Sequence, residues 1–162
     1  MEEHTEESID TDRILVGVDG SRSSIDALRY AARIASAFDA PLEVVTSWYY
    51  PPYMDYTVVT EWSPEEEAQL ILQQAVEDAF GSAPPEGMKR TLYPGPPART
   101  LIKLSETAGM LVLGSRGHGG FAGLLLGSVS AACAEHAHCP VLIVHGRSAA
   151  EPADAGEQEE RR

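Results

Sequence analysis

The chain has 162 residues, of which 43% are hydrophobic, so it is long enough for one domain with a buried core and too short for two ordinary domains. Its formal net charge is −13, which argues against general binding to nucleic acid, because contact with a phosphate backbone requires a basic surface. It has only two cysteines, Cys133 and Cys139, and these form no disulfide framework. The chain also lacks an apolar run of the roughly 18 residues that span a membrane, and its N-terminus does not resemble a signal peptide. We therefore predict a cytoplasmic protein that does not enter a membrane.

Much of the acidic charge lies near the two ends of the chain. Residues 1–13 hold six acidic residues and one Arg, and residues 147–162 hold five acidic residues and three Arg. Such segments are usually solvated. We predict flexible charged tails over residues 1–12 and 147–162, and one folded domain over residues 13–146.

The first predicted strand covers residues 14–18, whose continuous apolar character is typical of a parallel sheet with both faces covered. Ser21 or Ser23 is a suitable N-cap for the helix that follows. Five apolar residues are expected on one face of that helix: Ile25, Leu28, Ala32, Ala35 and Phe38. A second strand is predicted over residues 42–46.

A long connection, residues 49–62, precedes the next helix and is longer than a simple turn requires, as in lids and contact surfaces. Ser63 is a good N-cap for this helix, with Pro64 at its first position and Glu66 completing a capping box. Gly81 is a suitable stop.

The second half of the chain alternates strands and helices in the same way. Strands are predicted over residues 89–93, 110–113 and 140–145, with a helix from residue 98 that Gly109 closes and another from Ser128 to about residue 137. Regular alternation of strands and helices indicates a doubly wound parallel sheet with helices on both faces.

The segment from Gly114 to Ser128 is rich in glycine and lies between an apolar strand and a helix start. Phosphate groups are bound by converging backbone N–H groups, and glycine lets the backbone approach closely. The N–H groups of Ser128 and Val129 lie at the positive end of a helix dipole and complete an anion site. The Ser128 hydroxyl is expected to cap that helix or to bond a phosphate oxygen. A surface loop that is glycine-rich for turning alone is the alternative.

This segment matches neither common phosphate-binding motif. It has no Gly-Lys-Ser/Thr, and the glycine spacing after the first strand does not fit a dinucleotide fingerprint. Arg116 is a candidate phosphate ligand because a guanidinium matches phosphate oxygens, and a solvated loop arginine is an equal alternative. His118 is interpreted as an exposed loop histidine.

The pattern Gly114-x2-Gly117-x9-Gly127-Ser128 resembles the ATP-binding signature of the universal stress protein family. Residues 14–21, 111–117 and 139–144 are similar to the family's first, fourth and fifth strands. The resemblance extends over residues 13–146, nearly the whole chain outside the tails.

This resemblance implies a three-layer α/β/α domain with a five-stranded parallel sheet, flavodoxin-like and doubly wound, of the adenine nucleotide alpha hydrolase-like type. ATP would lie across the carboxyl ends of the strands with Mg²⁺ held through its phosphates. The glycines at 114, 117 and 127 and Ser128 would hold the phosphates and ribose, and Asp19 the nucleoside. The adenine pocket would lie near Thr46 and Ser47. For Asp19, the alternative is an acid at a helix N-terminus that bonds Ser21.

Two other functions were weighed against nucleotide binding. Cys133, His136, His138 and Cys139 together suggest a zinc site, but a helix-to-strand junction is the favoured interpretation because the ligands must reach one tetrahedral centre. We find no nucleophile–base–acid set, so slow or partner-dependent ATP hydrolysis is the alternative to a nucleotide-dependent stress or signalling module.

The last strand, residues 141–144, is apolar and by resemblance lies at a sheet edge. An exposed apolar edge favours symmetric pairing, so a homodimer is expected. A protein partner is also expected, but the sequence does not identify it.

Overall fold

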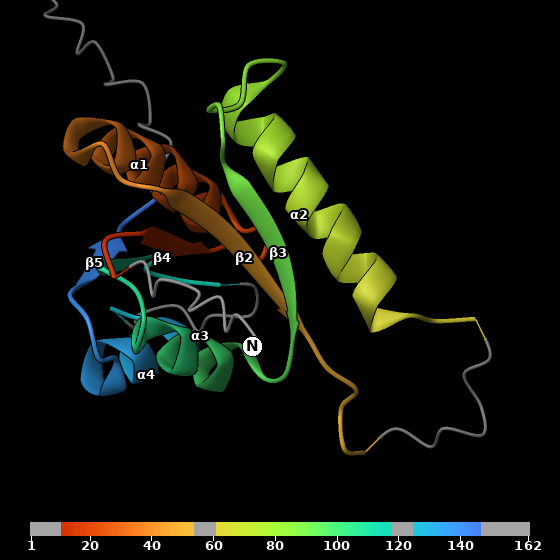
Figure 1. Cartoon of the computed structure of the whole chain (residues 1–162). Coiled ribbons are helices and arrows are strands. Elements are labelled where there is room, and N and C mark those ends of the chain that lie inside the picture. Colours follow the sequence, from red (N-terminus) through yellow and green to blue (C-terminus); the bar gives the residue numbers. More distant parts are fainter. Residues whose placement is uncertain (1–10, 54–60, 118–124, 147–162) are drawn as a thin grey trace, which may run out of the picture.

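The computed structural model describes residues 11–53, 61–117 and 125–146. Strands and helices alternate along them in the predicted order (Figure 1). The strands are β1 (Ile14–Gly17), β2 (Leu42–Trp48), β3 (Lys89–Pro94), β4 (Met110–Gly114) and β5 (Val141–Val144). The helices are α1 (Arg22–Phe38), α2 (Pro64–Phe80), α3 (Pro97–Ser105) and α4 (Ser128–His136). The flexibility expected of the tails concerns residues that lie almost wholly outside the described ranges.

The five strands form one parallel sheet in the order β3-β2-β1-β4-β5. Helices α1 and α2 cover one face, and α3 and α4 cover the other (Figure 1). The predicted three-layer, doubly wound architecture is therefore confirmed.

Both faces of β1 are covered by helices, which explains why its sequence is apolar throughout. The Val16 side chain packs in the cluster beneath α1 and α2, whereas the neighbouring Leu15 packs beneath α3 and α4, and both are fully buried. Successive side chains of a strand point to opposite faces, so a central strand of a covered sheet needs apolar residues at every position.

The chain order reverses between β1 and β4. β1 leads through α1 to β2 and onward to one edge, and β4 leads through α4 to β5 at the other edge. At such a switch point the connections leave in opposite directions and open a crevice at the carboxyl ends of the strands. This crevice holds the site described below.

Three local predictions needed correction. Phe38 was expected on the buried face of α1 but is 72% exposed. The 17 residues of α1 span about 25 Å, and the four of β1 span about 13 Å, so the last turn of the helix extends past the strand. Helix α3 ends at Ser105, before Gly109, and β2 continues to Trp48 instead of ending at residue 46.

The long connection begins and ends in an aromatic cluster. The ring of Tyr50 lies edge-on to the rings of Trp48 and Trp62, with centroid separations of 6.2 Å in both pairs. Residues 54–60, on which the prediction of a lid or contact surface depends, lie outside the described ranges. Among the helices of the described residues, none combines the length and hydrophobicity needed to cross a membrane.

Signals at the two ends of α2 are confirmed. The Ser63 hydroxyl accepts a hydrogen bond of 3.3 Å from the N–H of Glu66, and Gly81 follows the last residue with a φ of 60°. Both features could be predicted from the sequence because helix caps depend on local backbone geometry.

Candidate functional site

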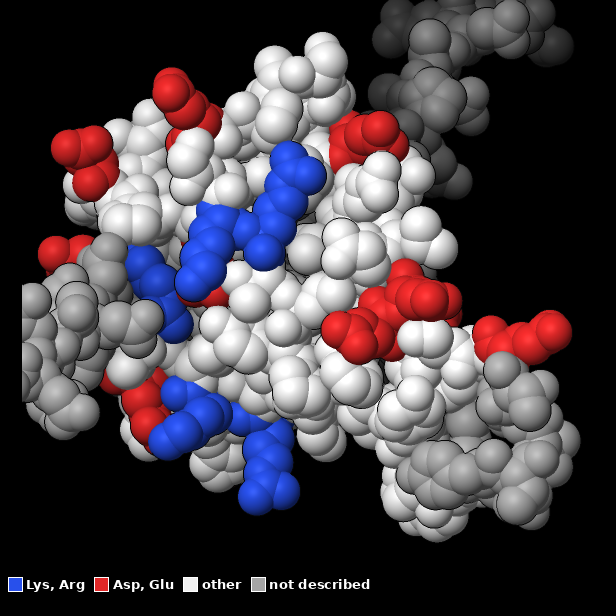
Figure 2. Space-filling view, turned by 45° about the vertical axis from the view of Figure 1, so that its right-hand side comes forward, with Lys and Arg blue, Asp and Glu red and all other residues white. Residues whose placement is uncertain are grey.

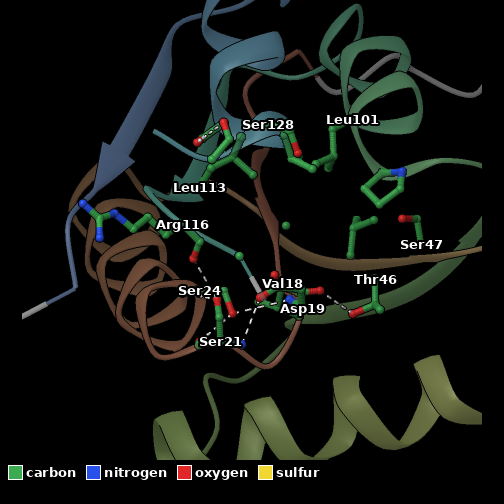
Figure 3. A pocket seen from close by; sticks show the side chains of 18 of the residues that line it. Val18, Asp19, Ser21, Ser24, Thr46, Ser47, Leu101, Leu113, Arg116 and Ser128 are labelled. Atoms are coloured by element: carbon green, nitrogen blue, oxygen red, sulfur yellow. Dashed lines mark hydrogen bonds between the residues drawn. The ribbon is translucent and has the colours of Figure 1, made fainter. Parts of the chain in front are cut away.

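A pocket of about 680 Å³ lies at the carboxyl ends of β1, β2 and β4 (Figure 3). The first turns of α1 and α4 contribute hydroxyl groups and backbone to its wall. Its location at the switch point between β1 and β4 is where open parallel sheets bind ligands.

All of the predicted site residues line this pocket. They come from segments far apart in the sequence: Asp19, Ser47, Gly114, Arg116, Gly117, Gly127, Ser128 and Val129. The fold brings them together because each follows the end of a central strand or opens a helix at the same edge of the sheet.

The N-terminus of α4 faces the pocket without a side-chain cap. Gly127 occupies the N-cap position, and no side chain bonds the first N–H groups of the helix. Of the two roles expected of the Ser128 hydroxyl, the cap of α4 is therefore wrong, because Ser128 is the first helical residue and is exposed, and the phosphate role stays a prediction. Among the described residues, the N–H groups of Ser128 and Val129 have no hydrogen-bond acceptor, as an anion site at a helix N-terminus requires.

The buried hydroxyl of Ser130 holds the start of α4 against the beginning of the glycine-rich segment. Its hydroxyl donates to the carbonyl oxygen of Ser115 at 2.9 Å and lies 3.1 Å from that of Gly127, while the Gly127 N–H donates to Ser115 at 2.7 Å. The two ends of the glycine-rich segment are thus tied to each other. Ser130 was not among the predicted residues, because its only signal in the sequence is a hydroxyl two residues after Ser128.

The start of α1 fixes the other side of the loop. The hydroxyl groups of Ser23 and Ser21 donate to the carbonyl oxygen of Arg116 at 2.6 and 3.2 Å. A Cβ on Gly114 would lie 2.6 Å from the backbone carbon of Ser23 and 2.7 Å from the backbone nitrogen of Ser24. Gly114 therefore lets β4 and α1 approach closely, a packing role that its predicted part in phosphate binding did not include.

Asp19 lies between the start of α1 and the glycine-rich loop. Its Oδ1 accepts a hydrogen bond of 2.9 Å from the N–H of Ser21, which is the contact of the alternative interpretation (Figure 3). Its Oδ2 lies only 2.5 Å from the position that a Cβ on Gly117 would occupy. The carboxylate thus borders the pocket beside a loop glycine, and its structural bond leaves its predicted nucleoside role untested.

The end of β2 forms the predicted adenine side. The Thr46 hydroxyl is buried and donates to the carbonyl oxygen of Val18 at 3.0 Å, so it holds β2 to the segment after β1. Ser47 follows at the pocket wall. Apolar side chains complete this region, and sequence reasoning missed them because they come from several elements without a shared motif: Ile71, Leu101, Leu113 and Leu126.

Arg116 is exposed, and in Figure 3 its guanidinium points away from Asp19 and Ser128. The backbone of Arg116 is fixed by the serines of α1, whereas its side chain lies at the margin of the pocket. His118 lies outside the described residues.

The four Cys and His residues near the end of α4 are spread over different environments. Cys133 is fully buried in the core, whereas the side chains of His136 and His138 are more than half exposed. Burial raises the pKa of the Cys133 thiol to about 11, with a further contribution from Cys139. Within the described ranges, no group of three or more His, Cys, Asp or Glu side chains is arranged to hold a metal ion.

Comparison with known proteins identifies the family and agrees with the fold. The model of the universal stress protein family matches residues 11–145, which include every strand and helix. The chain belongs to the universal stress protein family. It is 40% identical over 143 residues to a universal stress protein of Mycolicibacterium smegmatis, covering 82% of this chain and 48% of that protein.

Other members of the family differ in length. A universal stress protein of Methanocaldococcus jannaschii is 30% identical over 139 residues, covering 82% of this chain and 81% of that protein. The chain spans about half the length of the mycobacterial relatives that it matches. Among solved structures, a universal stress protein in complex with cAMP has a TM-score of 0.63 and 30% identity, covering 85% of this chain and 99% of the other.

Proposed function

We propose that this universal stress protein binds ATP with Mg²⁺ in the pocket between β1 and β4. The observation that carries the proposal is the convergence of all the predicted site residues on that one pocket. Its volume of about 680 Å³ lies within the roughly 300–1,000 Å³ typical of small-ligand sites. The 30% identical neighbour in complex with cAMP supports an adenine nucleotide as the class of ligand.

The phosphates are assigned to the start of α4 and the glycine-rich loop. The N–H groups of Ser128 and Val129 have no acceptor among the described residues, and the helix dipole favours an anion there. Mg²⁺ is held through the phosphates. Asp19 is assigned to the ribose, and the end of β2 at Thr46 and Ser47 to the adenine ring, against the apolar side chains of that region.

Equilibrium titration with ATP and Mg²⁺ tests this proposal. A Gly127→Val variant is suitable because a Cβ at residue 127 first meets backbone atoms of Gly117 and Arg116 at 3.4 and 3.5 Å, so added bulk presses on the loop and not on the core. We expect saturable binding by the parent chain and at least tenfold weaker binding by the variant. Unchanged affinity in a folded variant would show that the loop is not the phosphate site.

We propose that the protein acts as a nucleotide-dependent stress-response or signalling module and not as an enzyme. The polar side chains of the described pocket wall are mainly hydroxyl groups, several of which already donate to backbone carbonyls, and Asp19 is the carboxylate among them. Efficient phosphoryl transfer needs groups that align water and neutralise charge. We expect phosphate release far below the roughly 1–100 s⁻¹ of kinases. Rapid release that disappears in a His118→Ala variant would instead support a hydrolase.

We also propose a cytoplasmic homodimer that pairs through β5. The two edge strands differ: β3 begins with the exposed Lys89 and Arg90, whereas β5 carries Val141, Leu142 and Ile143, all only partly buried. Charged side chains protect an edge from pairing, and an apolar edge favours it. Light scattering over a range of concentrations tests the assignment, and a monomer throughout the micromolar range would refute it.

A further inference from the structure

A second hollow lies between the edge strand β3 and helix α3, and α3 also contributes Pro97 and Leu101 to the nucleotide pocket. This β3–α3 groove has a volume of about 780 Å³, and its walls come from the end of β3, the turn at Gly95 and one side of α3. Tyr93, Pro94, Ile102 and Leu104 give it an apolar lining. The groove exists because β3 is an edge strand, so α3 crosses toward β4 and leaves the outer part of the sheet uncovered.

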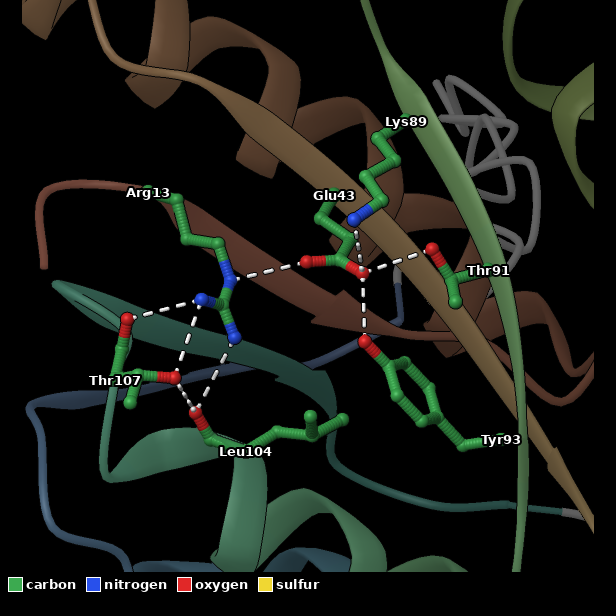
Figure 4. A network of polar contacts seen from close by, with 7 residues as sticks. All are labelled: Arg13, Glu43, Lys89, Thr91, Tyr93, Leu104 and Thr107. Atoms are coloured by element: carbon green, nitrogen blue, oxygen red, sulfur yellow. Dashed lines mark hydrogen bonds and ion pairs between the residues drawn. The ribbon is translucent and has the colours of Figure 1, made fainter. Parts of the chain in front are cut away.

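A buried carboxylate lies behind the groove residue Tyr93. Glu43 is 4% exposed and accepts hydrogen bonds from the hydroxyl groups of Thr91 and Tyr93 at 2.8 and 3.1 Å (Figure 4). Its other oxygen, Oε2, lies 3.0 Å from Nε of Arg13. The ammonium of Lys89 lies 3.9 Å from Oε1, the oxygen that accepts the two hydroxyl hydrogen bonds. The charge of Glu43 is therefore fully occupied within the fold.

Arg13 connects this network with the end of α3. Its guanidinium donates to the carbonyl oxygens of Thr107 and Leu104 at 3.0 and 3.4 Å. Leu104 also lines the groove. The chain that precedes Arg13 thus leaves the fold directly beside the groove.

The groove has a positive rim in a strongly acidic protein. The side chains of Lys89 and Lys103 are 68% and 76% exposed, and Arg99 lies one helical turn before Lys103 on the same side of α3. Arg99 and Lys103 with Glu106 leave a charge of +1 in the groove lining, and Arg13 and Lys89 with Glu43 leave a further +1 in the adjoining network, against −13 for the chain. Figure 2 shows Lys and Arg side chains gathered on the face that it displays, with Asp and Glu side chains around them.

Part of this positive charge is available to a ligand. Lys103 pairs with Glu106 at 2.7 Å, but both are at the surface, where such a pair contributes little. Arg99 has no ion-pair partner among the described residues. An acidic, extended peptide would complement both the cationic rim and the apolar lining.

We propose that residues 1–10 of this chain bind in the β3–α3 groove and neutralise its rim. These ten residues carry five acidic side chains and no Lys or Arg: Glu2, Glu3, Glu6, Glu7 and Asp10. They end three residues before Arg13, whose guanidinium donates to the carbonyl oxygen of the groove residue Leu104. When extended they reach about 33 Å, more than twice the roughly 14 Å length of α3, so they span the groove easily.

Zero-length carbodiimide crosslinking of the full chain tests the proposal sharply. Lys89 and Lys103 are the only two lysines of the chain. Lys103 lines the groove, and the ammonium of Lys89 lies 3.9 Å from Glu43, which the groove residue Tyr93 also contacts. The reagent joins a carboxylate to an ammonium in direct contact as an amide. We expect mass spectrometry to find peptides that join Glu2, Glu3, Glu6, Glu7 or Asp10 to these lysines, and the Lys103–Glu106 link serves as the internal control for reaction.

Three comparisons decide the outcome. The tail links should weaken severalfold in 0.5 M NaCl, because salt screens charges at the surface. They should also weaken in Arg99→Ala, which keeps both lysines, and not in the control Arg33→Ala on α1. A 1:1 mixture of ¹⁴N- and ¹⁵N-labelled chains distinguishes links within one chain from links between copies. The proposal is overturned if only Lys103–Glu106 forms, if the tail links join different copies, or if Arg99→Ala leaves their yield unchanged.

Discussion

Replacing Gly114 with Ala should destabilise the fold itself and not only the nucleotide loop. The new Cβ would lie 2.4 Å from Ser23 Oγ and within 2.7 Å of backbone atoms of Ser23 and Ser24. Real Cβ atoms essentially never approach so closely, and backbone atoms at the start of α1 do not swing aside as the end of a side chain does. Strand β4 and helix α1 would therefore have to separate.

The size of this effect follows from two terms. Overpacking of a core costs about 1–3 kcal/mol, and movement of Ser23 also weakens its 2.6 Å hydrogen bond to Arg116, a net loss of about 1 kcal/mol. We expect the free energy of unfolding to fall by about 2–4 kcal/mol and Tm by roughly 5–15 °C. Gly127→Ala is the matched control, since its Cβ finds its nearest neighbour at 3.4 Å and its φ of −73° is open to any residue.

Urea denaturation followed by tryptophan fluorescence measures both variants. Gly127→Ala should lose at most about 1 kcal/mol, the difference between glycine and alanine at an N-cap. Equal stability of the Gly114→Ala variant and the parent would refute the packing role of Gly114. An equal loss in both variants would show that the two glycines are not distinguished by the space around them.

Three further predictions concern other parts of the molecule. Gly117→Ala should weaken ATP binding about 10–100-fold and lower stability by at most about 1 kcal/mol, because the new Cβ displaces the Asp19 carboxylate, which lies 2.5 Å from its position and accepts a hydrogen bond from Ser21; unchanged affinity in titration would remove Asp19 from the site. Glu43→Ala should cost about 3 kcal/mol in urea denaturation, because it leaves a largely buried arginine without its partner, and a loss below 1 kcal/mol would contradict this. Iodoacetamide at pH 8 should modify Cys139 before Cys133, because Cys133 is fully buried and its thiol pKa is raised to about 11; equal rates measured by mass spectrometry in the folded protein would be the contrary result.

The sequence was sufficient for the order of elements, and local chemistry explains why. The caps at Ser63 and Gly81 and the apolar strands each depend on a few neighbouring residues. The features that local patterns did not predict correctly depend on tertiary geometry. Phe38 has the periodicity of a buried residue but lies past the end of the strand it would cover, and Gly114 has a neighbour, Ser23, that no local pattern connects with it.

The same distinction applies to the site. Its glycines, Asp19 and Ser128 were identified because they form an ordered motif that resembles a family signature, and they do line one pocket. The apolar wall and the β3–α3 groove were missed. The apolar wall includes Ile71 of α2 and Leu101 of α3, which become neighbours only when helices of both faces meet the sheet. The groove comes from one segment, residues 93–106, whose strand and helix form it only when they pack together.

Nucleotide binding and pairing through β5 should affect each other, because one buried residue touches both places. Ser115 accepts hydrogen bonds from Gly127 at the end of the loop and from Ser130 in the first turn of α4, and its N–H donates to the carbonyl oxygen of Val144 of β5 at 2.9 Å. Contact alone does not create coupling, which requires that ATP bind the paired and unpaired chains with different affinity. If it does, the dimer constant must change with ATP by the factor by which pairing changes ATP affinity. We expect sedimentation equilibrium with and without ATP and Mg²⁺ to give different dimer constants, and the difference to shrink in Ser130→Ala, which removes the hydroxyl bonds to Ser115 and Gly127. Identical dimer constants with and without ATP, in a dimer that binds ATP, would show that Ser115 connects the two regions without coupling ATP binding to pairing.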